Sequence, residues 1–147
     1  MLDGKWNTEG DKFVVGCGSS AAAVGYYNVG TLSGAMRTDS LEMWNTQIIA
    51  RLHDSSVISV AFEASGLVFA TGSTDGSAKI VSSYLPEIDG AKSFSGPFGE
   101  VKTFGEVLHN IGPLGDWVNS VAWSPDSTWL GYTTHNSLVH FWSQSSC

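Results

Sequence analysis

A glycine-rich stretch near the start of the chain has the residue pattern of a dinucleotide phosphate site. Residues 13–21 read as a strand followed by Gly-x-Gly-x-x-Ala, and Asp39 follows about 20 residues later, where such sites place the acid that binds the ribose. The site also needs a helix directly after the glycines. Gly25 and Gly30 fall where that helix would run, and each costs about 1 kcal/mol relative to alanine. We therefore favour a strand-turn-strand hairpin over a small nucleotide-binding α/β enzyme.

Ser59, His53 and Asp75 have the residue types of a hydrolytic triad. Ser59, however, lies in the middle of an expected strand and lacks the sharp turn that exposes a catalytic nucleophile. His53 and Asp75 fit better in a structural hydrogen-bond network that ties a loop to a hairpin, with the hydroxyl groups of Thr71 and Ser73 as further members. The sequence therefore gives no reason to expect an enzyme.

The histidines do not suggest a metal site. They fall at turns or in separate strands, without a spacing such as His-x-x-x-His: His53, His109, His135 and His140. His140 alternates with apolar neighbours, which predicts a partly buried strand residue. The neighbouring acids Glu87 and Asp89 lie in an expected loop, where we expect them to be solvated. We expect no metal and no cofactor.

The composition limits the classes of partner that the chain is expected to bind. The chain has 147 residues, of which 42% are hydrophobic and only 14% are charged, and the net charge is −7. No Lys or Arg follows Lys102, so we expect no binding to nucleic acid or to anionic lipid. No apolar run approaches the roughly 18 residues of a membrane span, and the first twelve residues are too polar for a secretory signal. The expected compartment is the cytoplasm.

Two parts of the chain repeat each other. Residues 57–62 (Val-Ile-Ser-Val-Ala-Phe) align without a gap, at an offset of 61, with residues 118–123 (Val-Asn-Ser-Val-Ala-Trp). A turn and two more short strands follow each segment, and residues 13–27 show part of the same pattern. The additional strands are expected at 67–72, 77–81, 128–133 and 138–142, with outer strands at 47–52 and 106–109.

Repeated units of four short strands predict an all-β fold, a β-propeller. The expected units are 12–52, 53–109 and 117–143, with an unassigned segment 1–11 before them and a tail 144–147 after them. The surplus length lies mainly in a loop at 86–103, and a second loop at 29–42 separates the third and fourth strands of the first unit. Because a compact blade takes roughly 40 to 45 residues, the chain supplies about three blades. We therefore expect a portion of a longer propeller, or a segment that another chain completes.

Short motifs follow one another in a distinctive order from about Lys12 to Trp142. They are Phe13–Gly18, Gly25–Tyr27, His53–Val57, Ser73–Gly76, Pro97–Glu100, Phe104–Glu106, Trp123–Pro125 and His135–Ser137. In this order they resemble the WD-repeat subunit (subunit 1) of the actin-related protein 2/3 complex. The resemblance implies the central part of a WD-repeat propeller, about three blades of a presumed seven. The opening and closing blades of the family, and its late projecting insertion, have no counterpart here.

The resemblance also implies a function. Such subunits are non-catalytic scaffolds that support the nucleation of branched actin filaments, in the cytoplasm and the actin cytoskeleton. Their partners would be the other subunits of the complex, actin and nucleation-promoting factors. The WD hydrogen-bond network would comprise His53, Thr71, Ser73, Asp75 and, in the last unit, Trp142. The middle unit has Val81 in place of the usual tryptophan. An unrelated WD-repeat interaction scaffold is the alternative.

Aromatic residues outside the strands, together with loops at the strand ends, indicate where partners would bind. Aromatic side chains are enriched among the residues that dominate binding energy. The candidate residues are Trp44, Asp54, Phe94, Phe98, Asp116, Trp117, His135 and Asn136. Phe94 and Phe98 lie in the 86–103 loop, which we expect to dock against a partner subunit. Trp44 and Trp117 could instead cover a blade edge.

Overall fold

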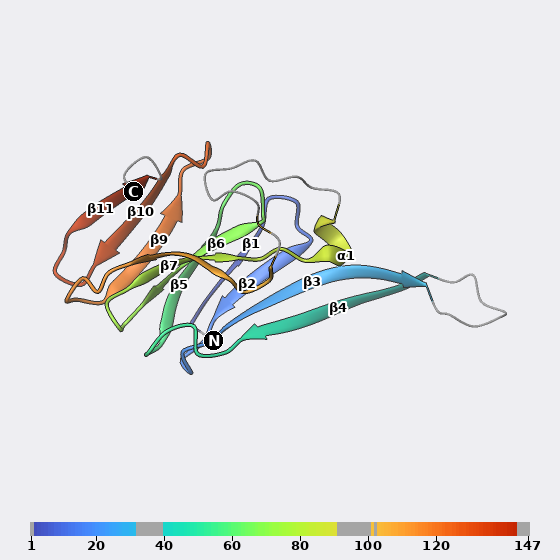
Figure 1. The fold of residues 1–147 in the computed structure, drawn as a ribbon, viewed down its shortest axis with the longest axis horizontal. Helices are drawn as coiled ribbons and strands as arrows, with labels where there is room; N and C mark the ends of the chain where they lie inside the picture. The colour runs from blue at the N-terminus through green and yellow to red at the C-terminus, as the bar shows by residue number, and fades with distance from the viewer. Residues whose placement is uncertain (1, 32–39, 91–100, 102, 144–147) are drawn as a thin grey trace.

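The computed structural model describes residues 2–31, 40–90, 101 and 103–143, and their strands form three antiparallel sheets arranged as an open fan (Figure 1). In each sheet every strand pairs with the next one along the chain. The first sheet contains β1 (Asp3–Trp6), β2 (Lys12–Gly16), β3 (Ala22–Thr31) and β4 (Ser40–Ile49). The second contains β5 (Val57–Phe62), β6 (Val68–Ser73), β7 (Ala78–Ser82) and β8 (Val107–Ile111). The third contains β9 (Val118–Trp123), β10 (Trp129–Thr134) and β11 (Val139–Ser143).

The turns of the second and third sheets repeat along with the strands. Gly66 and Gly76 have φ values of 73° and 84°, in the left-handed region that glycine enters without a steric cost. Ser127 and Ser137, which stand 61 residues later, have φ values of 61° and 67°. The repeated sequence therefore encodes the same left-handed turn positions, and it keeps them even where a serine replaces the glycine.

The core consists of two apolar layers, one on each side of the second sheet. Because successive side chains of a strand point to opposite faces, β6 can fill both layers, and all of its residues are buried. Phe69 packs toward the first sheet with Val14 and Val24. Val68 and Ala70 pack toward the third sheet with Leu130. The second sheet is thus the centre of the molecule, and the first and third sheets each turn one face outward.

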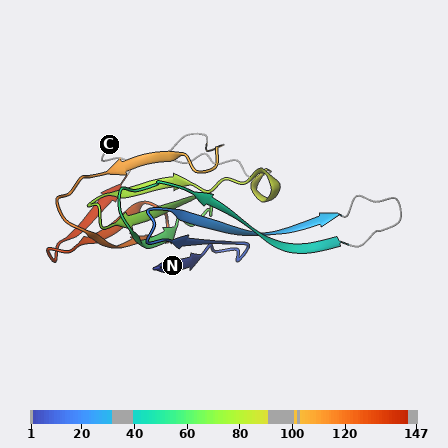
Figure 2. The ribbon, with the colours of Figure 1, turned by 90° about the horizontal axis from the view of Figure 1, so that it is seen from below.

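The strands expected from the repeat are confirmed, and those at 57–62 and 118–123 have the expected bounds. Three segments differ. Residues 3–6, within the segment that had no assignment, form β1 and pair with β2. The prediction of a loop over 29–42 is wrong at both ends, because β3 and β4 stay paired out to Thr31 and Ser40. Their ladder satisfies backbone groups that a loop would leave to water, and it carries the hairpin away from the other strands (Figure 2).

The third difference is a short helix. The expected loop over 86–103 begins with one helical turn, α1 (Pro86–Asp89). Pro86 is its first residue, a position where proline's fixed φ suits a helix and its missing N–H is not needed. The turn closes through the backbone bond from Asp89 N–H to the carbonyl of Leu85 (2.7 Å). This helical turn places the Asp89 side chain in the interior of the protein.

Gly16 provides the first prediction. A Cβ at this position would lie 2.6 Å from the carbonyl oxygen of Val57, a backbone atom of the neighbouring sheet. Gly16→Ala is therefore expected to cost about 1–3 kcal/mol of the free energy of unfolding, because the first two sheets must move apart. Urea unfolding followed by tryptophan fluorescence measures this. Gly131→Ala is the matched control, since its Cβ would meet nothing closer than 3.7 Å; equal losses in the two variants would contradict the prediction.

Candidate functional site

Asp75, in the turn between β6 and β7, accepts hydrogen bonds at both carboxylate oxygens. Its Oδ2 lies 2.9 Å from Nδ1 of His53 and accepts the backbone N–H of Asp54 at 3.0 Å. Its Oδ1 accepts the backbone N–H and the hydroxyl group of Ser77, at 2.8 and 2.7 Å. The carboxylate thus connects the turn to the segment that precedes β5.

His53 extends the network into the second sheet. Its Nε2 lies 2.7 Å from the hydroxyl oxygen of Thr71, in the middle of β6. A neutral ring with its proton on Nδ1 donates to Asp75 and accepts from Thr71, so one tautomer satisfies both contacts. Ser73 accepts the N–H of Asp75 (3.1 Å) and donates to the carbonyl of Ser56 (2.8 Å). These bonds tie the turn between β6 and β7 to β6 and to the segment before β5, and we call the four residues the clamp: His53, Thr71, Ser73 and Asp75.

Burial and hydrogen bonding set the charges of this clamp. Burial of His53 is the main cause that lowers its pKa below 6.5, and it outweighs the opposing attraction of Asp75. For Asp75, burial opposes the charged form, but hydrogen bonds from Ser77 and from the Asp54 backbone outweigh it and lower the pKa to about 2. At neutral pH the clamp therefore holds a neutral imidazole and a carboxylate.

These two shifts predict how stability depends on pH. Both pKa values are lower in the folded chain, so the unfolded chain binds more protons, and the free energy of unfolding falls as the pH decreases. The His53 contribution is lost as the pH falls below about 6.5. The Asp75 contribution is lost between about pH 4 and pH 2. Urea midpoints across this range should show both losses. Asp75→Asn should flatten the profile below pH 4; a variant profile that still parallels the parent there would count against this assignment.

The third sheet repeats the turn with an amide in place of the carboxylate. Asn136 Oδ1 accepts the hydroxyl group of Thr134 (2.5 Å) and the N–H of Leu138 (3.3 Å). Trp142 is the predicted member of the network in the last unit. It is buried in the layer between the second and third sheets, and its ring centroid lies 4.8 Å from that of His109 on β8.

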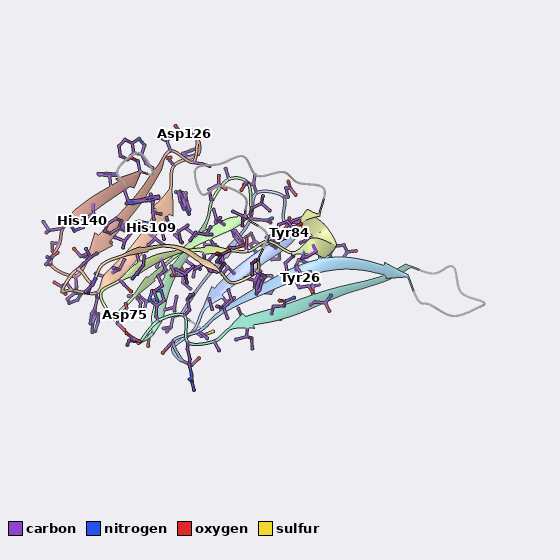
Figure 3. All side chains as sticks on the ribbon, in the orientation of Figure 1. Tyr26, Asp75, Tyr84, His109, Asp126 and His140 are labelled. Atoms are coloured by element: carbon purple, nitrogen blue, oxygen red, sulfur yellow. The ribbon has the colours of Figure 1, made fainter. Side chains whose placement is uncertain are left out.

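Five of the sequence-predicted binding residues lie at one end of the sheets, and we call them the loop-end surface: Asp54, Asp116, Trp117, His135 and Asn136. Each precedes or follows a strand at the end where β5 and β9 begin. Figure 3 shows Asp75 at this end and Asp126 at the opposite end. The rings of Trp117 and His135 are 5.1 Å apart, and the Asp116 backbone lies against Gly76. Trp117 is 49% exposed.

The other three candidates lie elsewhere. Trp44 lies within β4 on the outer face of the first sheet, 48% exposed. Phe94 and Phe98 fall outside the described residues. The loop-end surface therefore places the exposed Trp117 side chain at the same end of the sheets as the carboxylates of Asp54 and Asp116.

A comparison with protein families identifies the repeat. The family described as "WD domain, G-beta repeat" (WD40) matches residues 46–82 and 105–143. The chain belongs to the WD40 repeat family. Each matched segment begins in the outer strand of one sheet and continues through three strands of the next. A WD40 repeat of this chain therefore crosses from sheet to sheet, and the clamp around Asp75 lies within the first match.

The similar proteins confirm the resemblance seen in the sequence. Subunit 1A of the actin-related protein 2/3 complex from Arabidopsis thaliana is 31% identical over 137 residues, which is 93% of this chain and 33% of that protein. Subunit 1 from Schizosaccharomyces pombe is 27% identical over 92% of this chain and 33% of its own length. Among solved structures, a chain of the mitotic checkpoint complex superposes with a TM-score of 0.64 at 15% identity, covering 97% of this chain and 34% of that chain. This WD40 chain spans about a third of these curated relatives.

The described strands test the nucleotide-site and triad interpretations of the sequence. Residues that would have formed the helix of a dinucleotide site are the strand β3, so the α/β alternative is wrong. Ser59 is buried, and its hydroxyl oxygen accepts the N–H of Val121 on the third sheet. Across the described ranges no cluster of three His, Cys, Asp or Glu side chains could hold a metal ion. In the same residues no helix has the length and apolarity needed to cross a bilayer.

One buried pair was not predicted. Asp89, expected to be solvated, is fully buried and forms an ion pair with Lys12 of β2, also fully buried. Lys12 Nζ also donates to the carbonyls of Gly66 (3.0 Å) and Ser83 (2.9 Å). One signal was available: Lys12 shares its strand face with Val14, and a strand face that buries valine buries a lysine only with partners. The partner, 77 residues away, could not be read from the sequence.

Proposed function

We propose that this WD40 chain is a non-catalytic scaffold that holds neighbouring subunits in an assembly of the actin-related protein 2/3 type. Similarity to subunit 1 of that complex over 93% of the chain is the observation that supports this function. By the same resemblance, the assembly acts in the cytoplasm at the actin cytoskeleton. Actin and nucleation-promoting factors are its further proposed partners.

The loop-end surface is the proposed contact. Trp117 provides an exposed aromatic anchor next to His135. Tryptophan is among the residue types that contribute most to binding energy at protein interfaces. Asp54 and Asp116 provide negative charge beside it, which favours a basic partner segment. The clamp of His53, Thr71, Ser73 and Asp75 fixes the turn below this surface and so keeps the surface rigid. A rigid surface loses less entropy on binding.

Co-expression with the remaining subunits of the complex tests the proposal. The tagged chain is expected to co-purify with them, and Trp117→Ala combined with Asp54→Ala should reduce recovery at least tenfold. Asp126→Ala is the control, because Asp126 is an exposed aspartate at the opposite end of the sheets. Recovery of no subunit with the parent chain would overturn the proposal and leave an unrelated WD-repeat scaffold as the better reading.

A further inference from the structure

The last strand of the first sheet is a long sheet edge. The strand order is β1-β2-β3-β4, so β4 pairs with β3 on one side and with no further strand of the described residues on the other. It has ten residues and stays paired with β3 from Ile49 out to Ser40. At about 3.4 Å per residue, this edge is roughly 30 Å long. Figure 1 shows β4 at the rim of the fan.

The strand register shows which backbone groups of β4 have no partner. The N–H of Tyr27 on β3 donates to the carbonyl of Asp11, next to β2, at 2.9 Å. The backbone groups of Tyr27 therefore point away from β4, and those of its partner Trp44 point away from β3. By alternation, the N–H groups of Trp44, Thr46 and Ile48 all point outward from the sheet. No backbone hydrogen bond reaches these three groups from the part of the chain that the structure describes.

The equivalent edge of the second sheet is protected, and the edge of β4 is not. Unpaired backbone groups invite another strand, so natural sheets protect their edges with short strands, lysine, proline or bulges. The last strand of the second sheet, β8, has five residues, and its pairing with β7 shifts register between Ile80 and Val81. β4 is twice as long, and its pairing with β3 has no register shift. Its sequence contains one charged residue, Glu42, and neither lysine nor proline.

Further blades of a propeller do not account for this edge. A propeller blade is a sheet of four strands, and the first sheet already has four, with β4 as the last. Neighbouring sheets of this chain contact each other through their faces and leave the edge of β4 free. The WD40 match begins at residue 46, whereas β4 begins at Ser40. The outer part of the hairpin thus extends beyond the matched repeat, as it extends beyond the other strands (Figure 2).

We propose that an extended segment of a neighbouring subunit adds to the free edge of β4 as a fifth strand of the first sheet. In strand addition, main-chain hydrogen bonds give affinity and alternate side chains give specificity. Trp44 and Ile48, beside this edge, are 48% and 70% exposed, so we expect apolar or β-branched residues at alternate positions of the segment. The added strand would also support the outer hairpin, because two strands alone are marginally stable in water. The inference rests on the proposed function, since the partner belongs to the same assembly.

Amide hydrogen exchange tests the added strand directly. It is measured at single residues by fragmentation mass spectrometry, in the chain alone and in the complex co-expressed with the remaining subunits. The N–H groups of Trp44, Thr46 and Ile48 should exchange at least about tenfold more slowly in the complex. The N–H groups of Asn45 and Gln47 point toward β3 and should be protected in both states, so they are the internal reference.

Two substitutions of Thr46 separate its N–H from its side chain. Thr46→Pro removes the outward N–H, and an edge strand tolerates proline where that group faces solvent. Thr46→Val keeps the N–H and is the matched control. When equal amounts of parent and variant compete for limiting subunits, the parent should be recovered at least about tenfold over Thr46→Pro and equally with Thr46→Val. Urea midpoints show whether each variant folds, and the exchange measurement on the parent depends on neither.

The contrary results are distinguishable. Unchanged exchange at Trp44, Thr46 and Ile48 in a complex that does form would overturn the added strand and leave the proposed function intact. Slow exchange of these groups in the chain alone would also overturn it, because the edge would already be covered by the same chain or by a second copy. Equal losses for Thr46→Pro and Thr46→Val would assign the contact to the side chain. Recovery of no subunit would overturn the added strand together with the proposed function.

Discussion

Asp89→Ala is expected to lower the free energy of unfolding by about 3–5 kcal/mol, because it removes the carboxylate that pairs with the buried Lys12 ammonium group. The ammonium group has three N–H donors, and the carbonyls of Gly66 and Ser83 and the Asp89 carboxylate accept from it. A neutral carbonyl group stabilises a buried positive charge less than a carboxylate does. Urea unfolding at neutral pH, monitored by tryptophan fluorescence, measures the loss.

Two further variants separate the lost pairing from other effects. Lys12→Met combined with Asp89→Leu removes both charges, and its loss should be smaller, about 1–3 kcal/mol, since two carbonyl groups then lose a donor and the Leu85 N–H loses its acceptor. Asp54→Ala, at an exposed aspartate, should stay within about 0.5 kcal/mol of the parent. If Asp89→Ala were no more destabilising than Asp54→Ala, the buried ion pair would have no part in stability.

The placement of Lys12 and Asp89 explains the size of this effect. Lys12 belongs to the first sheet. Gly66 lies in the turn between β5 and β6 of the second sheet, Ser83 directly follows β7, and Asp89 lies in α1. Asp89 Oδ2 also accepts the N–H of Leu85 (2.9 Å), which holds α1 in place. One ion pair thus joins two sheets and the helix, so its loss should weaken the contact between the first and second sheets as a whole.

Local signals allowed most of the strands to be predicted from the sequence. Turn residues at Gly66 and Gly76, and their repetition 61 residues later, mark the hairpins of the second and third sheets independently of the rest of the chain. The members of the clamp could be chosen from the sequence for a similar reason, because His53, Thr71 and Asp75 lie within about one repeat. Trp142 belongs to the last unit, and it packs in the apolar layer between the second and third sheets.

Features that depend on distant parts of the chain could not be predicted. β1 has only four residues, and it exists because β2 offers an edge to pair with. The hairpin of β3 and β4 extends out to Thr31 and Ser40 because the two strands stay paired, and no single residue in the sequence indicates this extension. Asp89 looked like a solvated loop acid because its environment is set by Lys12. Local patterns therefore locate strands, while burial is decided by which sheets meet.

Two phenylalanines in strands of similar sequence show that burial depends on which sheets meet. Phe69 and Phe141 both lie within short β-strands rich in apolar residues, yet Phe69 is fully buried and Phe141 is 70% exposed. Phe69 occupies the layer between the first and second sheets, where its neighbours include Val14, Val24 and Phe62. Phe69→Ala is therefore expected to cost about 3–5 kcal/mol of the free energy of unfolding.

The cost should lie near the upper part of that range because the site cannot collapse. Phe69 belongs to β6, whose opposite face is filled by the layer against the third sheet, so the strand cannot shift to close the cavity without opening the other layer. Phe69→Leu, which keeps more of the volume, should lose less than about half as much. The unfolding midpoints of the two variants in urea give the comparison.

Phe141→Ala is the matched control, made in another strand and on a face that meets solvent. It should change the free energy of unfolding by no more than about 0.5 kcal/mol. A loss equal to that of Phe69→Ala would mean that the outer face of the third sheet is covered within the chain. A negligible loss for Phe69→Ala would mean that the first and second sheets do not pack as the structure has them. Removing a buried phenyl ring from a well-packed layer leaves a cavity, and the cavity costs free energy.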